Sequence, residues 1–253
     1  MQAIDDFRKL AESLVGAGRV CVLTGAGVSK ESGVPTFREA DGLWSRFRPE
    51  ELANVEAFIS NPERVWEWYS WRRELMAGVQ PNPGHYALAE LEELLGHFVL
   101  ITQNVDNLHQ NAGSRDVIEL HGNIQRNRCH SCHRFYPEGT VKFAKGELPR
   151  CECGGLIRPD VVWFGEMLPP EAIDRASREA QRCDVFLSIG TSAVVYPAAA
   201  LPHQAKAAGA RLVEINPAPT ELSPLADLVF RMPSGEAMPR IVEEVKALLE
   251  ERG

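Results

Sequence analysis

The sequence has little of what several classes of protein require. Its apolar runs all fall short of the roughly eighteen residues that a membrane helix needs. Residues 1–10 carry four charged side chains before any apolar run, so they do not resemble an export signal. Basic residues are outnumbered, with 27 Lys and Arg against 35 Asp and Glu and a net charge of -8. A nucleic-acid binder normally carries a basic face. We therefore expect a soluble, cytoplasmic protein with no membrane partner and no specific nucleic-acid partner.

Cysteine is also scarce, with six residues in 253, which is too few for a disulfide-dense fold of this size. Four of the six form two close pairs, Cys129-x-x-Cys132 and Cys151-x-Cys153. Four thiolates suit tetrahedral Zn²⁺, and such a site is structural because no position remains open for water. His130 or His133 could replace one thiolate, and another thiophilic metal would fit the same spacing. We predict a four-cysteine zinc site, and we expect Cys21 and Cys183 to be buried small apolar residues.

Four short apolar runs each end in a small or polar cluster, which is typical of buried parallel strands. They cover residues 20–24, 98–102, 185–189 and 211–215. Segments with helical spacing alternate with them, at residues 4–17, 86–95, 170–182, 197–208 and 240–250. This alternation predicts an α/β fold with a Rossmann-like, doubly wound parallel sheet and helices on both faces. Ligands of such sheets collect beyond the carboxyl ends of the strands.

Two insertions interrupt the alternation. Residues from about 31 to 80 hold four of the five tryptophans, and residues from about 124 to 157 hold four of the six cysteines. We interpret them as a smaller module, partly helical and partly zinc-binding, that packs beside the sheet. The whole chain, 1–253, is then one domain whose large part comprises about 1–30, 81–123 and 158–253.

The turn after the first predicted strand carries part of a dinucleotide fingerprint. Gly25-Ala-Gly27 supplies its first two glycines, which permit a tight turn and a close approach of backbone N–H groups to a pyrophosphate. The third position is Lys30, which disfavours an ordinary hydride-transferring dehydrogenase. The alternative is that these glycines only turn the chain. His121, followed by a glycine, could serve as a general base or could be structural.

In order along nearly the whole chain, these motifs resemble those of the sirtuins, which are NAD-dependent protein lysine deacylases. The matching segments are 25–38, 102–106, 120–122, the thiol pairs, 161–166, 190–192 and 215–217. The resemblance implies NAD as co-substrate, one structural Zn²⁺ and acyl-lysine proteins or peptides as substrates. It also implies His121 as the general base and nicotinamide, 2′-O-acyl-ADP-ribose and free lysine as products. A monomer is compatible with this interpretation.

The same resemblance assigns the remaining site residues. Cofactor binding is expected of Gly25, Ala26, Gly27, Thr36, Phe37, Arg38, Trp44, Gln103, Asn104, Asp106, Gly190, Thr191, Ser192, Asn216 and Ser234. Within this set, Asp106 would hold the nicotinamide carboxamide. Val161 and Val162 would pair with the substrate peptide as an added strand, and Trp163, Phe164 and Gly165 would shape the apolar lysine tunnel.

One further motif bears on the acyl group. Tyr69 and Arg72 are three residues apart, so a helix would present them on one face. A hydroxyl and a guanidinium can jointly bind a carboxylate. The pair resembles the signature of sirtuins that remove succinyl, malonyl or glutaryl groups, and Ala53 matches the small residue that widens their acyl pocket. The alternative is that Tyr69 packs with Trp66 while Arg72 pairs with Glu63.

Two other functions stay open at this point. Protein mono-ADP-ribosyl transfer would use the same NAD site with a different acceptor. A zinc-ribbon regulator that binds nucleic acid would account for the thiol pairs, although the net charge of -8 opposes it.

Overall fold

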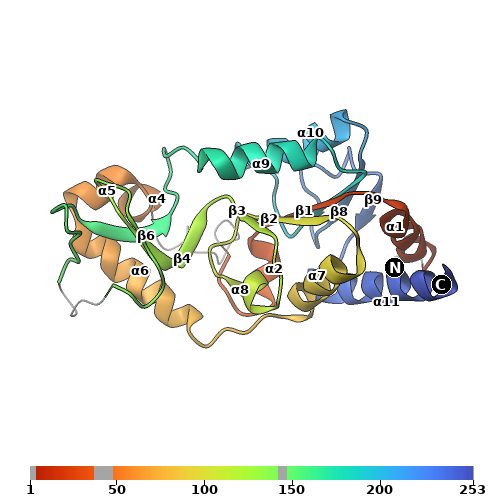
Figure 1. The fold of residues 1–253 in the computed structure, drawn as a ribbon, viewed down its shortest axis with the longest axis horizontal. Coiled ribbons are helices and arrows are strands. Elements are labelled where there is room, and N and C mark those ends of the chain that lie inside the picture. Colours follow the sequence, from red (N-terminus) through yellow and green to blue (C-terminus); the bar gives the residue numbers. More distant parts are fainter. Residues whose placement is uncertain (1–3, 37–47, 142–146, 253) are drawn as a thin grey trace.

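A parallel sheet forms the centre of the large part, and a smaller part lies at one end of it (Figure 1). The computed structural model describes residues 4–36, 48–141 and 147–252. The sheet order is β3 (Val117–Glu119), β2 (Phe98–Thr102), β1 (Val20–Thr24), β7 (Val185–Ile189), β8 (Arg211–Ile215) and β9 (Leu228–Phe230). Every pairing in it is parallel. Numbered within the sheet this is the Rossmann order 3-2-1-4-5-6, so the predicted fold class is confirmed.

The four strands predicted from apolar runs occur at the predicted residues. β1, β2 and β7 are buried along their whole length, because helices cover both faces of the sheet. Successive side chains of β1 enter opposite cores: Val22 packs in one apolar cluster and Leu23 in the other. Cys21 and Cys183 are both buried in the second cluster, as predicted.

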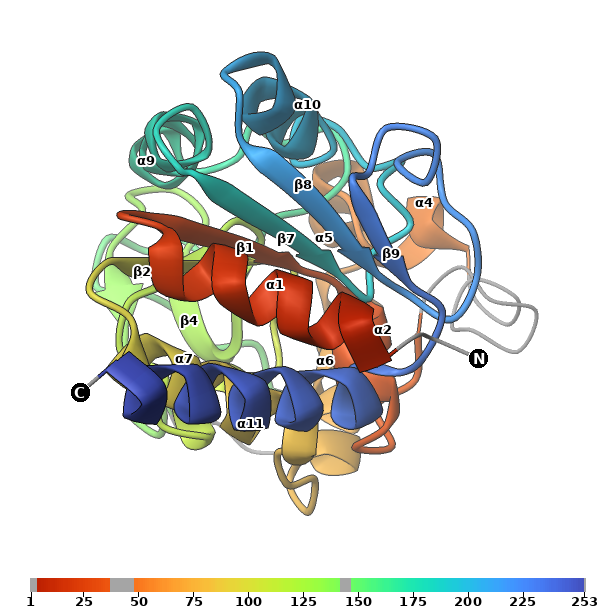
Figure 2. The same cartoon turned by 90° about the vertical axis from the view of Figure 1, so that its right-hand side faces the viewer.

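The helices form one layer on each face of the sheet (Figure 2). One face is covered by α1 (Ile4–Gly16), α7 (Pro83–Leu94) and α11 (Ser234–Arg252), and the other by α9 (Pro170–Ala180) and α10 (Ala200–Ala207). α7 begins three residues earlier than predicted, because the Asn82 side chain caps it by accepting from the Gly84 N–H at 2.9 Å. α11 also begins earlier, at Ser234, where the Glu31 carboxylate accepts from the Gly235 N–H at 2.9 Å.

The smaller part combines helices with a second sheet. Its elements are α4 (Pro49–Leu52), α5 (Val55–Ser60), α6 (Pro62–Met76) and the antiparallel strands β5 (Phe135–Tyr136), β4 (Gly122–Cys129) and β6 (Ile157–Val161) in the order β5-β4-β6. They share a third apolar core that includes Phe58, Trp66 and Trp163. None of the helices in the described ranges combines the length and the apolar character that a membrane span needs.

Candidate functional site

A cavity of about 760 Å³ lies at the carboxyl ends of the central strands and extends to the smaller part. Seventeen of the predicted site residues line it: Gly25, Ala26, Gly27, Thr36, Ala53, Tyr69, Arg72, Gln103, Asn104, His121, Val161, Val162, Phe164, Gly190, Thr191, Ser192 and Asn216. Phe37, Arg38 and Trp44 lie outside the described residues. The edge of the sheet at which a doubly wound fold binds its ligand therefore coincides with the predicted residues.

The floor of the cavity is formed where two glycine turns touch. α2 (Ala26–Lys30) follows β1, and the Gly27 N–H donates to the Gly190 carbonyl oxygen at 2.8 Å. A Cβ on Gly25 would lie 2.8 Å from that oxygen, and one on Gly27 would lie 2.8 Å from the Gly190 Cα. Gly190 itself has φ +59°, in the left-handed region. Glycine is thus required here by backbone packing, whichever ligand the turn meets.

Two amide side chains after β2 connect the ends of the neighbouring strands. The Gln103 Nε2 donates to the Thr191 hydroxyl at 2.9 Å, across to the end of β7. The Asn104 Nδ2 donates to the Gly25 carbonyl oxygen at 3.0 Å and to the Ser29 hydroxyl at 3.1 Å. Both amides are therefore held by fixed partners at the cavity wall, which suits groups that orient the hydroxyls of a bound ligand.

His121 stands at the start of β4 with a defined tautomer. Its Nδ1 lies 2.9 Å from the Gln103 carbonyl oxygen, which can only accept, so Nδ1 carries the hydrogen and Nε2 is the basic nitrogen. Burial lowers the pKa of His121 below 6.5, and the bond to Gln103 opposes that shift. The imidazole is accordingly neutral at neutral pH, as a general base must be.

Two predicted residues are buried but are not among those that line the cavity. The Asp106 carboxylate accepts from the Leu108 N–H at 3.0 Å, and burial raises its pKa against the effect of that hydrogen bond. The Ser234 hydroxyl donates to Glu31 at 2.9 Å at the start of α11. Their assignment to the cofactor stays a prediction.

Tyr69 and Arg72 both face the cavity from α6. They are 1% and 4% exposed, and both line the cavity wall, whereas Glu63 is exposed. The Arg72 Cζ lies 4.9 Å from the centre of the Trp68 ring and burial lowers the pKa of this guanidinium, an effect that the Tyr69 hydroxyl and Asp106 oppose. The structure thus favours the interpretation that Arg72 is an interior group of the cavity over that of a surface ion pair.

The end of β6 and the segment that follows it form another wall of the cavity. β6 lies at the edge of its sheet, where Val161 pairs with Gly122, and the Val162 N–H donates to the His121 carbonyl oxygen at 2.9 Å. The Phe164 N–H donates to the Ala53 carbonyl oxygen at 2.9 Å, and Phe164 as a residue is 46% exposed. An edge strand of this kind can accept a further strand.

Several further residues line the cavity. Trp68, Glu166, Val194 and Tyr196 are among them, and Trp163, which was expected to shape the lysine tunnel, lines the cavity as well. Trp163 is the largest of the fully buried side chains, and its contact with Tyr69 depends on two segments far apart in the chain. The resemblance covered this residue within the segment 161–166, but local sequence carried no signal for that contact.

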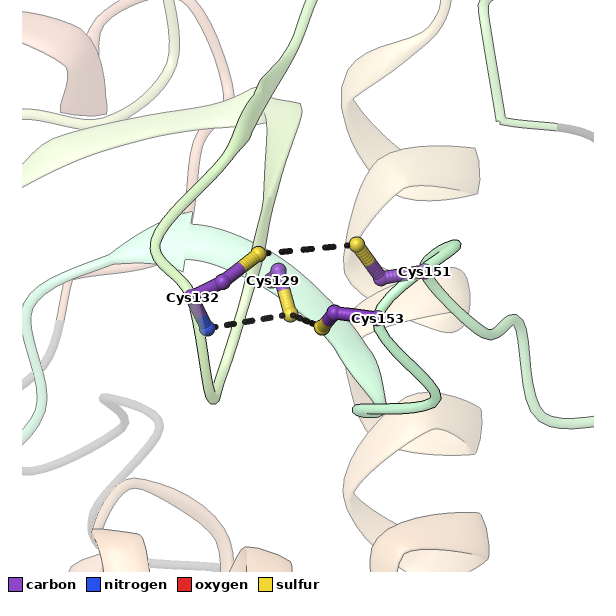
Figure 3. Close-up of side chains that lie close together, drawn as sticks. All are labelled: Cys129, Cys132, Cys151 and Cys153. Atoms are coloured by element: carbon purple, nitrogen blue, oxygen red, sulfur yellow. Dashed lines mark hydrogen bonds between the residues drawn. The ribbon is translucent and has the colours of Figure 1, made fainter.

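The four predicted cysteines converge in the smaller part (Figure 3). Their sulfur atoms lie within 4.8 Å of one another, with 3.5 Å between Cys129 and Cys153 and 3.6 Å between Cys132 and Cys151. Tetrahedral zinc–thiolate bonds of about 2.3 Å would separate the sulfurs by about 3.8 Å. His130 instead packs against the Phe58 ring, with 5.6 Å between ring centres. The cluster is compatible with a structural zinc held by four thiolates.

The fold and the cavity together define a doubly wound α/β protein with a ligand site at the carboxyl edge of its sheet and an inserted four-cysteine module. Residues 25–197 match the model of the Sir2 family. The chain is 53% identical to NAD-dependent protein deacylase 1 of Archaeoglobus fulgidus over 95% of this chain and 98% of the relative. It is 54% identical to NAD-dependent protein deacylase 2 of Pyrobaculum aerophilum over 94% and 96%. The chain belongs to the Sir2 family.

Solved structures agree with this assignment. A Sir2 homologue in complex with NAD superimposes with a TM-score of 0.89 at 52% identity, over 95% of this chain and 94% of that one. A complex of Sir2 with a p53 peptide and NAD superimposes with a TM-score of 0.84 at 36% identity, over 94% and 98%.

Proposed function

We propose that this protein is an NAD-dependent protein deacylase that removes acyl groups from lysine side chains and that favours the negatively charged succinyl and malonyl groups over acetyl. The observation that carries the proposal is that a neutral imidazole and a buried tyrosine–arginine pair line the same cavity, as His121, Tyr69 and Arg72 do. Relatives named NAD-dependent protein deacylase, similar over almost the whole chain, support the reaction class.

In the proposed reaction the amide oxygen of the acyl-lysine attacks C1′ of the nicotinamide ribose, and nicotinamide leaves. The ribose 2′-hydroxyl then attacks the acyl carbon, and with addition of one water the C–N bond breaks, so that lysine leaves as the amine and the acyl group stays on ADP-ribose. The Nε2 of His121 accepts the proton of a ribose hydroxyl, while the Gln103 carbonyl oxygen keeps the imidazole in the required tautomer. The amides of Gln103 and Asn104 orient the ribose, and the turns at Gly25 and Gly190 receive the pyrophosphate. Positioning supplies much of the acceleration, because a carbonyl oxygen is a poor nucleophile.

The acyl preference follows from the cost of burying a charge. Arg72 is 4% exposed, beside the aromatic rings of Trp68 and Tyr69, and burial lowers its pKa. A guanidinium held in such surroundings gains most from a ligand that brings a carboxylate, because their attraction is stronger away from bulk water. An acetyl group brings no such charge, whereas a succinyl or malonyl group does.

A comparison of acyl peptides tests the proposal. One peptide sequence carrying acetyl-, succinyl- or malonyl-lysine is incubated with the protein, with and without NAD, and the products are weighed by mass spectrometry. We expect the peptide to lose its acyl group only when NAD is present, with one nicotinamide formed per acyl group removed. The kcat/KM should be higher for the succinyl- and malonyl-lysine peptides than for the acetyl-lysine peptide. ADP-ribose attached to protein while the acyl-lysine stays intact would support the transferase alternative instead. Acyl loss without NAD would refute both.

A further inference from the structure

The indole of Trp163 makes a hydrogen bond whose direction is fixed by chemistry. Its Nε1–H donates to the Tyr69 hydroxyl oxygen at 2.8 Å, across 94 residues of sequence. The two side chains are 2% and 1% exposed. An indole nitrogen can donate but cannot accept. The oxygen of Tyr69 is therefore the acceptor, and its own hydrogen points elsewhere.

The indole is held in place by neighbours on several sides. The Arg158 guanidinium stacks on the Trp163 ring, with its Cζ 3.2 Å from the ring centre, and the Phe58 ring centre lies 5.2 Å away. Arg158 binds the Glu166 carboxylate at 2.6 and 2.9 Å, and Glu166 accepts the Trp163 backbone N–H at 2.8 Å. The donor that meets Tyr69 is thus fixed before any ligand arrives.

A second donor lies beside the Tyr69 ring. The Arg72 Cζ is 5.6 Å from the centre of that ring, and Tyr69 opposes the lowering of the Arg72 pKa by burial. A guanidinium also donates only, and a hydroxyl has two acceptor sites and one hydrogen. The Trp163 N–H occupies one acceptor site of the Tyr69 oxygen, so the hydroxyl hydrogen is directed away from the indole.

We infer that Trp163 is a specificity-determining positioning residue, whose indole N–H orients the Tyr69 hydroxyl to donate toward the terminal carboxylate of an acidic acyl chain. The inference rests on the proposed preference for such chains. A carboxylate accepts only, so it gains from a hydroxyl that is already turned to donate and from the neighbouring Arg72 fork. The methyl end of an acetyl group offers no acceptor there.

The test is Trp163→Phe, which removes the N–H and keeps an aromatic ring. We expect the ratio of kcat/KM for the succinyl-lysine peptide to that for the acetyl-lysine peptide to fall about tenfold, the size expected for a misdirected hydrogen bond to a charged group. In a Tyr69→Phe background the same substitution should leave the ratio unchanged, because no hydroxyl remains to be oriented. A purely structural role of Trp163 would lower the ratio by the same factor in both backgrounds.

Trp66→Phe is the matched control. Trp66 is also buried, at 3% exposure, but its indole N–H donates to the Ile157 carbonyl oxygen at 2.9 Å and it does not line the cavity. Its succinyl-to-acetyl ratio should equal that of the wild type. If the wild type prefers succinyl-lysine and Trp163→Phe retains that ratio, the inference is wrong while the proposed function stands. A wild type without an acidic preference would overturn both.

An NMR measurement covers the case that Trp163→Phe does not fold. ¹⁵N-labelled protein should give an indole N–H signal that is retained in Trp68→Phe, is displaced by Tyr69→Phe and shifts with the succinyl-lysine peptide, which identifies it as that of Trp163. The acetyl-lysine peptide should shift this signal less. Equal shifts with both peptides would overturn the inference.

Discussion

Replacing Arg72 by methionine should separate acidic from neutral acyl groups. Methionine keeps an unbranched chain against the Trp68 ring and removes the charge. Truncating one partner of a buried charge pair costs about 3 kcal/mol, which corresponds to roughly a 150-fold loss of kcat/KM on succinyl-lysine. On acetyl-lysine only packing changes, so we expect a loss of about threefold at most, near 0.6 kcal/mol.

The stability of the variant provides an internal check. Burial lowers the pKa of Arg72 in the folded protein, so the charged side chain carries a desolvation cost that is absent in the unfolded chain. Arg72→Met removes that cost, and its thermal midpoint should be equal to or above that of the wild type. A loss of desuccinylation in this variant would then not reflect unfolding.

Arg73→Met is the control for the charge. The neighbouring guanidinium donates to the Ile124 and Arg126 carbonyl oxygens at 2.6 and 3.1 Å, so its removal should lower the unfolding midpoint while the succinyl-to-acetyl ratio stays near the wild-type value. The assay is steady-state kinetics on both peptides at saturating NAD. Equal losses on the two peptides in Arg72→Met would refute acid recognition by this residue.

Three further predictions concern other parts of the molecule. His121→Tyr should abolish turnover, while metal analysis should find its zinc content unchanged. Because burial lowers the pKa of His121, the kcat/KM of the wild type should fall as the pH drops through that pKa, which lies below 6.5, since the protonated imidazole cannot act as a base. Gly190→Ala should lower the free energy of unfolding by about 3 kcal/mol in denaturant titrations, because Gly190 has φ +59° and an added Cβ would lie 2.5 Å from the Val28 nitrogen. Gly78→Ala is the control: an added Cβ there would have nothing within 4 Å, so the free energy of unfolding should change by less than about 1 kcal/mol. Cys151→Ser should reduce bound zinc from one equivalent and lower the thermal midpoint, and unchanged zinc content would argue against a four-thiolate site.

The sequence predicted the sheet wherever burial is continuous. β1, β2, β7 and β8 have five residues each and are mostly buried, and each was located at its observed bounds. β3 and β9 have three residues each and lie partly exposed at the two edges of the sheet. Strands this short form because a neighbouring strand is available to pair with them. The apolar pattern of three residues is too short to predict a strand by itself.

The site was predictable to the extent that its residues follow strands directly. Gln103 and Gly190 each come just after a buried strand, and parallel strands bring their carboxyl ends to one edge. The hydrogen bond from Trp163 to Tyr69 joins segments from different elements of the smaller part, and only tertiary packing brings them together. Ser234 was assigned to the cofactor by the resemblance alone; its hydroxyl donates to Glu31, and the assignment stays a prediction.

The adjacency of β1 and β7 has a consequence for how the protein is made. Thr24 and Ile189 pair at the carboxyl ends of these two strands, beside the cavity floor, and are 165 residues apart in the sequence (189 minus 24). The floor of the cavity therefore cannot form during synthesis until most of the chain has emerged. The pairing of β1 with β7 also carries a large entropy cost, because it closes a long loop of chain. We expect N-terminal fragments that end before β7 to have no cofactor affinity at all, so that binding of NAD reports complete folding of the sheet.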